Sequence, residues 1–135
     1  MEARDQAMEI QDLGSLQIRV LDMLWSRGEA TAGELRETWA EKPRPAYTTV
    51  LSALQKLYRR KLVGRRKRGR AHAYAPRVEQ EAFRRACVEA LRGQVFGGSA
   101  VGIVAALLGG ERVEADDIEE IRRLIRERAR EGKRG

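Results

Sequence analysis

Apolar side chains recur at three- and four-residue steps near the start of the chain. This spacing places them on one face of a helix, and Gly28 follows where a glycine commonly ends one. The pattern therefore predicts a first helix from about Leu13 to Gly28. Its apolar stripe consists of Leu13, Leu16, Ile18, Val20, Leu21, Leu24 and Trp25.

A shorter helix is predicted next. Thr31 precedes Glu34 by three positions, which is the spacing of a capping box. Leu35 and Trp39 give this helix an apolar side, and the prolines at positions 43 and 45 stop it.

The helical pattern restarts at Ala46 and separates two faces. The packing face is expected to hold Val50, Leu51, Leu54, Leu57 and Tyr58. The outward face is expected to hold Thr48, Thr49, Ser52, Gln55, Lys56, Arg59 and Arg60. After it, the segments RRKRGR and AHAYAP flank a turn at Gly69 and predict a β-hairpin with a basic tip.

Three more helices are expected after the hairpin. Ser99 is a candidate N-cap, the glycines at 109 and 110 end that helix, and the aspartates at 116 and 117 favour the start of the last one. The closing REGKRG segment is expected to fray.

The order of helix, short helix, helix and hairpin is that of a winged helix-turn-helix. The predicted fold class is therefore mainly α. A winged DNA-binding domain is expected over residues 1–76, with an ordered core at about 13–76, and a helical dimerisation domain over residues 77–135.

The C-terminal helices carry more apolar residues than three short helices can bury alone. They could fold back on the winged domain, but a two-fold partner is the favoured prediction. The residues expected at this interface are Phe83, Leu91, Phe96, Val101, Val104, Leu107, Leu108, Ile118, Ile121, Leu124 and Ile125.

Charge adds a functional prediction to this outline. The chain has 27 basic and 20 acidic side chains, for a net charge of +7. Residues 42–78 hold 12 basic and no acidic side chains, whereas residues 1–41 hold 4 and 9. A mixed-sign run would indicate only a solvated face, but a single-signed block repels itself and favours binding to nucleic acid.

The candidate DNA contacts lie on the third helix and the hairpin. Thr48, Thr49 and Ser52 could meet base edges or phosphates, or could simply cap and solubilise the helix. Tyr47 could contact a phosphate or fill the core of the helix turn. The cations assigned mainly to phosphates are Lys56, Arg59, Arg60, Arg65, Arg66, Lys67, Arg68 and Arg70. Arg44 and Arg68 are the candidates for entry into a groove.

Three segments carry a resemblance to a known family. They are LGSLQIRVLDMLW at 13–25, AYTTVLSALQKLYRRKLVGR at 46–65 and GRAHAYAP at 69–76. With the helical remainder, the chain resembles the BlaI/MecI penicillinase-repressor family from Leu13 to about Arg128. The resemblance implies a homodimeric bacterial transcription repressor that binds a pseudo-palindromic operator, with β-lactamase-type resistance genes as the best-known targets.

The resemblance also implies a way to release the DNA. In some members, a membrane-bound zinc-protease sensor leads to cleavage early in the C-terminal module, commonly at an Asn-Phe bond. The matching position here is Val95 and Phe96, so the Phe is present and the Asn is not.

Other classes of function find little support in the sequence. One His and one Cys form no metal-ligand cluster, no nucleotide or hydrolase motif is present, and no cofactor is expected. No apolar run approaches the roughly 18 residues of a membrane span, and the start of the chain is unlike a signal peptide. A cytoplasmic protein is expected. The alternative function is an architectural protein that coats nucleic acid without reading its sequence.

Overall fold

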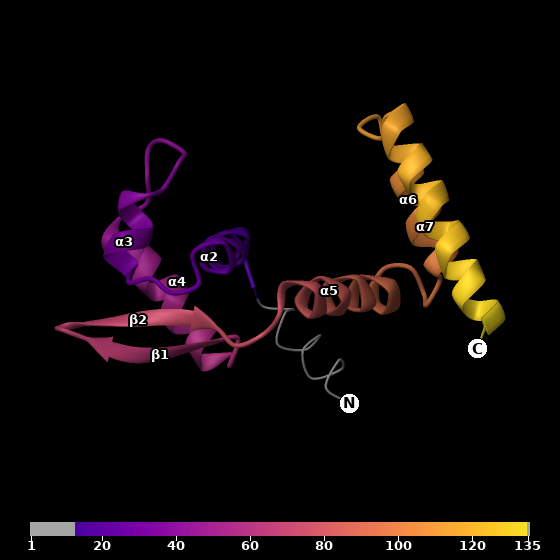
Figure 1. Ribbon diagram of the computed structural model, residues 1–135. Coiled ribbons are helices and arrows are strands. Elements are labelled where there is room, and N and C mark those ends of the chain that lie inside the picture. Colours follow the sequence, from indigo (N-terminus) through magenta and orange to yellow (C-terminus); the bar gives the residue numbers. More distant parts are fainter. Residues whose placement is uncertain (1–12, 135) are drawn as a thin grey trace. The chain divides into compact units, whose positions relative to one another are not determined.

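Three helices and a hairpin make up the winged helix-turn-helix. Helices α2 (Ser15–Arg27), α3 (Ala32–Glu37) and α4 (Tyr47–Arg59) are followed by strands β1 (Val63–Arg68) and β2 (Ala71–Pro76) (Figure 1). The structure, a computed structural model, describes residues 13–134. The acidic segment at residues 1–12 lies outside the described residues. The predicted fold class, a mainly α chain with a winged helix-turn-helix and further helices after it, is confirmed.

The first two helices end where local chemistry stops them. Gly28 closes α2 with a φ of +90°, a conformation that glycine adopts without strain. Helix α3 ends at Glu37, so the prediction that Trp39 lies on this helix is wrong. The Thr38 hydroxyl donates to the carbonyls of Glu34 and Leu35 at 3.0 and 3.3 Å, and such local bonds compete with a further helical turn.

Helix α4 is the centre of the first unit and packs against α2, α3 and β1. Its buried side is close to the prediction, but Tyr58 is wrongly assigned to it because its side chain is exposed. The buried core cluster consists of Val20, Leu21, Leu24, Ala30, Ala32, Leu35, Val50, Ala53, Leu54, Leu57, Leu62, Val63, Tyr74 and Phe83.

The hairpin is antiparallel and pairs Val63 with Pro76 at its base and Arg68 with Ala71 at its tip. Gly69 takes a φ of +66° in the two-residue turn, as tight hairpins require. Ala30 adds an isolated bridge on the other edge of β2. Its N–H donates to the Tyr74 carbonyl at 3.0 Å, and the Tyr74 N–H donates back at 2.8 Å.

Helix α5 (Gln80–Gln94) begins in this first unit, which extends to Ala90. Phe83 is only 5% exposed and packs on Trp25 with ring centroids 5.3 Å apart. The prediction that Phe83 contributes to a dimer interface is therefore wrong. An apolar helical stripe does not reveal which neighbour covers it, and here Trp25 of α2 covers Phe83.

The second unit begins at Leu91 and contains α6 (Ala100–Leu108) and α7 (Ala115–Arg134). Ser99 caps α6 as predicted, because its hydroxyl accepts from the Gly102 N–H at 2.8 Å. Gly109 follows α6, and the two aspartates lie in the first turn of α7. The closing segment is helical up to Arg134, which corrects the expected fraying from residue 130.

Candidate nucleic-acid interface

The outward face of α4 borders an open groove of about 420 Å³. Thr48, Thr49 and Ser52 are exposed there, in the first two turns of the helix. Their hydroxyls are suited to contact a base edge or a phosphate oxygen. The groove is lined by Leu16, Gln17, Thr48, Thr49, Ser52, Ala53, Lys56 and Arg59. Leu16 and Gln17 come from α2 and were not among the predicted site residues, because nothing in the sequence shows that the start of α2 faces α4.

The entry to α4 is held by α3. The Tyr47 ring is about half exposed and lies beside Gly33, where a Cβ atom would stand 4.0 Å from the Tyr47 Cε2 atom. Arg44 donates from Nη1 to the Arg36 carbonyl at 3.4 Å. Arg36 in turn donates from Nε to the Pro45 carbonyl at 3.0 Å. Arg44 is thus tied to the end of α3, and its predicted entry into a groove stays a prediction.

The cations of β1 divide between the two faces of the hairpin. Alternate residues of a strand point to opposite faces, so Arg65 and Lys67 share one face while Arg66 and Arg68 share the other. The Arg65 guanidinium lies over the exposed ring of Tyr58, 3.9 Å from its centroid, in a cation–π contact that connects the hairpin to α4. Within residues 13–134, neither Lys67 nor Arg70 has a hydrogen-bond or ion-pair partner, and both are exposed.

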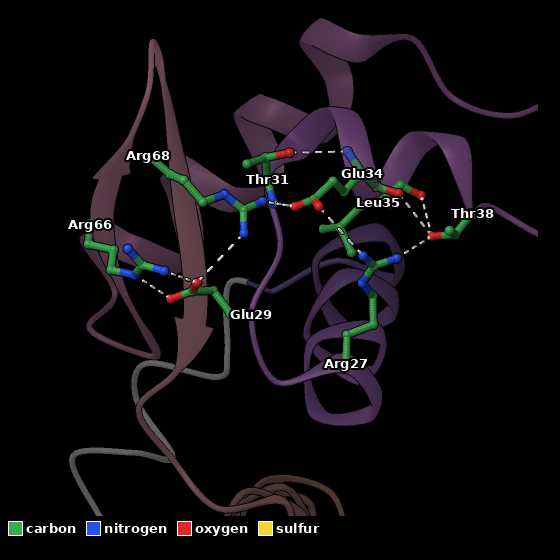
Figure 2. Close-up of polar contacts among 8 residues, drawn as sticks. All are labelled: Arg27, Glu29, Thr31, Glu34, Leu35, Thr38, Arg66 and Arg68. Atoms are coloured by element: carbon green, nitrogen blue, oxygen red, sulfur yellow. Dashed lines mark hydrogen bonds and ion pairs between the residues drawn. The ribbon is translucent and has the colours of Figure 1, made fainter.

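The other face of the hairpin meets two carboxylates (Figure 2). Arg66 donates to Glu29 from Nε at 2.9 Å and from Nη2 at 2.7 Å, a two-pronged pair. Arg68 donates to Glu34 and lies 3.8 Å from Glu29. Two of the predicted phosphate contacts are therefore paired within the protein.

Glu34 has a second role in the helix that carries it. Its carboxylate accepts from the Thr31 N–H at 2.9 Å, and the Thr31 hydroxyl accepts from the Glu34 N–H at 3.2 Å. The predicted capping box of α3 is thus confirmed. The sequence indicated this box, but it did not indicate that the same carboxylate meets the hairpin.

The two carboxylates are more acidic than ordinary glutamates. The hydrogen bond from Arg66 is the main cause that lowers the pKa of Glu29, and the coulombic attraction of Arg66 and Arg68 adds to it. The pKa of Glu34 is lowered chiefly by its bond to the Thr31 backbone and then by Arg68. Both groups are charged at neutral pH, and this keeps them effective partners for the arginines.

The remaining predicted contacts, Lys56, Arg59 and Arg60, lie along the C-terminal part of α4. Arg59 is exposed, while the other two are half-buried. The outward face of α4 thus carries hydroxyl side chains at its start and cationic side chains toward its end.

The predicted interface residues of the second unit are largely open to solvent. None of the described residues from Leu91 onward is buried. Val101 is 79% exposed, and Val104, Leu107, Leu108, Leu124 and Ile125 are exposed as well. Leu91 and Ile118 are also exposed, whereas Phe96 and Ile121 are half-buried.

The candidate cleavage bond lies in the turn between α5 and α6. Val95 is 67% exposed, and its N–H donates to the Leu91 carbonyl at 2.9 Å. Phe96 rests against Gly102, where an added Cβ would lie 3.3 Å from the Phe96 Cδ1 atom. The structure therefore places Val95 at the surface and Phe96 against the first turn of α6.

Neither a metal site nor a membrane span is found in the described part of the chain. Between residues 13 and 134, no three His, Cys, Asp or Glu side chains gather in a way that could hold a metal ion. None of the helices in this range combines the length and the apolar character needed to cross a membrane. Cys87 is half-buried beside the core, and burial raises the pKa of its thiol.

Comparisons with known proteins show what the chain is similar to. The sequence profile of the family described as Penicillinase repressor matches residues 13–127. The chain is 36% identical to the Transcriptional regulator BlaI of Mycobacterium tuberculosis strain CDC 1551 / Oshkosh, over 85% of this chain and 83% of that protein. The protein of the same name from strain ATCC 25618 / H37Rv matches equally. A solved structure, described as the solution structure of the DNA binding domain of the repressor BlaI, matches with a TM-score of 0.47 and 16% identity, over 54% of this chain and 89% of that one.

Proposed function

The chain belongs to the penicillinase repressor family, and from this premise we propose that it is a homodimeric repressor of transcription that binds a pseudo-palindromic operator. The observation that carries the proposal is the surface of α4 and the hairpin. There, exposed hydroxyls adjoin an open groove, and the wing presents cations that have no partner among the described residues. This is the distribution that a winged helix needs to place one helix in the major groove and its hairpin along the backbone.

The hydroxyls and the cations have different tasks in this proposal. Thr48, Thr49 and Ser52 contact base edges and set sequence preference. Lys67 and Arg70, with Arg59 on α4, contact phosphates, which adds affinity for any sequence and fixes the register of the protein on the duplex.

Exposed apolar side chains support the dimer. A unit with no fully buried residue among those described gains less from the hydrophobic effect as a single copy than a unit with a closed core does. A second copy that covers α6 and α7 would bury the stripe formed by Val101, Val104 and Leu108. Two wings related by a two-fold axis then require two operator half-sites separated by one or more helical turns.

The proposals about regulation and target genes rest on the family of the chain rather than on the geometry of its surface. We propose that the genes controlled are of the antibiotic-resistance, β-lactamase type. A membrane sensor protease system is a further proposed partner. Its proposed target is the Val95–Phe96 bond, where the Val95 side chain is exposed. A repressor of this kind works where the chromosome lies, so we propose the cytoplasm as its location.

Footprinting on captured DNA tests the proposal. Fragmented genomic DNA is retained on the protein, sequenced, and then used for protection experiments beside unrelated duplexes. We expect protected half-sites with two-fold symmetry. Replacement of Thr49 or Ser52 by Ala should relax base preference at one position of each half-site, at about 1–3 kcal/mol per lost base contact. Equal affinity for every duplex and no protected site would favour the alternative, an architectural protein that binds without reading sequence.

A further inference from the structure

Two arginines of the wing are turned away from the other cations of β1. Arg66 and Arg68 lie on the hairpin face opposite to Arg65 and Lys67, because strand residues alternate. Their neighbours across the pair, Ala73 and Ala71, have small side chains. An arginine can therefore reach over β2, and Ala73 is only 1% exposed although it shares this face with the arginines.

The carboxylates that receive these arginines are held in place by the fold. Glu29 adjoins Ala30, which is bonded to the backbone of β2 in both directions. Glu34 is fixed by the capping box of α3. Both carboxylates therefore stand at defined positions beside the hairpin, as Figure 2 shows.

A phosphate and a carboxylate compete for the same guanidinium donors. Arg66 already uses Nε and Nη2 in its pair with Glu29. To bind a phosphate with these atoms it must leave Glu29, and the freed carboxylate would then repel the DNA nearby. The Arg66–Glu29 pair thus lowers the affinity that the wing contributes to any DNA duplex, whatever its sequence.

We infer that Glu29 and Glu34 are specificity-determining residues, which restrain Arg66 and Arg68 and so limit the sequence-independent affinity of the wing for DNA. The inference rests on the proposed function, since it concerns how the same surface meets a duplex. It also revises the predicted roles of these two arginines: they position the hairpin, while Lys67 and Arg70 supply its phosphate contacts.

The test measures the salt dependence of binding to a mixed-sequence duplex of about 30 base pairs. Glu29→Gln keeps the size of the side chain and removes its charge. Released Arg66 side chains in both copies of a dimer should make the slope of log K against log salt steeper by about 2. The loss of affinity between 50 and 200 mM salt should then grow by about tenfold.

Glu37→Gln is the matched control. Glu37 is exposed at the end of α3 and has no partner among the described residues, so its replacement makes the same change in net charge without releasing an arginine. The slope of this variant should stay close to that of the unaltered protein. If the two substitutions change the slope equally, the inference is overturned, because the effect of Glu29 would then come only from the change in net charge.

Arginine variants supply the second arm. Arg66→Ala should leave the slope nearly unchanged, whereas Lys67→Ala should make it shallower by about 2 in a dimer. In the Arg66→Ala background, Glu29→Gln should change the slope much less, because only the longer contact of Glu29 with Arg68 at 3.8 Å is left to release. If Arg66→Ala flattens the slope as much as Lys67→Ala does, Arg66 binds phosphate in the complex and the inference is wrong.

Failure of the proposed function has a different signature. Tight binding without any sequence preference contradicts the proposal of a sequence-specific repressor. The salt slopes measured on the mixed-sequence duplex still decide whether Glu29 restrains Arg66. Absence of duplex binding by every variant contradicts both. Circular dichroism of each variant confirms that the changes in slope come from folded protein.

Discussion

Single residues decide how the basic wing is used. Sequence composition treats the cations of β1 as equivalent, but their neighbours differ. Arg65 lies over Tyr58, Arg66 pairs with Glu29, and Lys67 has no partner among the described residues. A charge count therefore overstates the number of cations that are ready to meet DNA.

The Arg66–Glu29 pair makes a prediction about pH. Because Arg66 lowers the pKa of Glu29 below its ordinary value in the folded chain, Arg66→Ala should raise that pKa toward the ordinary value. The contribution of the pair to stability is fully present above the unfolded pKa and is lost as pH falls through the lowered folded pKa. Carboxyl carbon NMR checks the pKa, and urea unfolding at about pH 7 and about pH 3 checks the linkage.

Lys67→Ala is the control for this experiment, since Lys67 points to the other face of the hairpin. The pKa of Glu29 should respond much less to this change. A Glu29 pKa that is the same with and without Arg66 would show that the pair is not formed in solution.

Among the elements, α3 depends most on its cap. A helix of six residues gains little from its own backbone bonds, so the reciprocal bonds of Thr31 and Glu34 matter for it. They also hold Glu34 beside Arg68. The cap of α3 and the anchoring of the hairpin are therefore one structural feature.

Thr31→Ala tests this feature at the level of stability. Loss of the hydroxyl that accepts from the Glu34 N–H should lower the free energy of unfolding by about 1 kcal/mol. Urea denaturation provides the measurement. Thr48→Ala is the matched control, because Thr48 is exposed in the first turn of α4, where no described side chain caps the helix. Equal losses for both variants would contradict the role assigned to the cap.

At the scale of the whole molecule, the two units differ in how they are stabilised. The first has a buried core that includes residues from α2, α3, α4, α5 and the hairpin. The second has no buried residue among those described and exposes most of its apolar side chains instead. We propose that a second copy covers these side chains and so stabilises this unit.

Leu107→Asp tests the proposed dimer. Leu107 is 58% exposed in the single chain, so the substitution removes little packing within it but places a charge in the proposed interface. We expect sedimentation to shift from dimer to monomer and binding to a symmetric operator to weaken. Gln94→Asp adds the same charge at an exposed polar position and should leave the dimer intact. An unaltered protein that sediments as a single copy at high concentration would contradict the proposal.

Prediction from the sequence fails where the same apolar pattern is compatible with several packing partners. Phe83 stands in an apolar helical stripe that could face a partner chain, and only the structure shows it against Trp25. Tyr58 fits the packing face of α4 by spacing, yet it lies at the edge of that face beneath Arg65. Periodicity identifies the apolar face of a helix, whereas the number of its residues that are buried depends on the elements that pack against that face.

The amino-acid sequence alone determined the order of the helices and the hairpin, the capping box at Thr31 and the turn at Gly69, because these depend on contacts between residues close in the chain. It also determined the concentration of positive charge in residues 42–78. The tertiary structure decided that Phe83 belongs to the first core and that Arg66 meets Glu29, 37 residues away. Such pairings depend on which strand faces and loops come together in space, and local spacing carries no information about that.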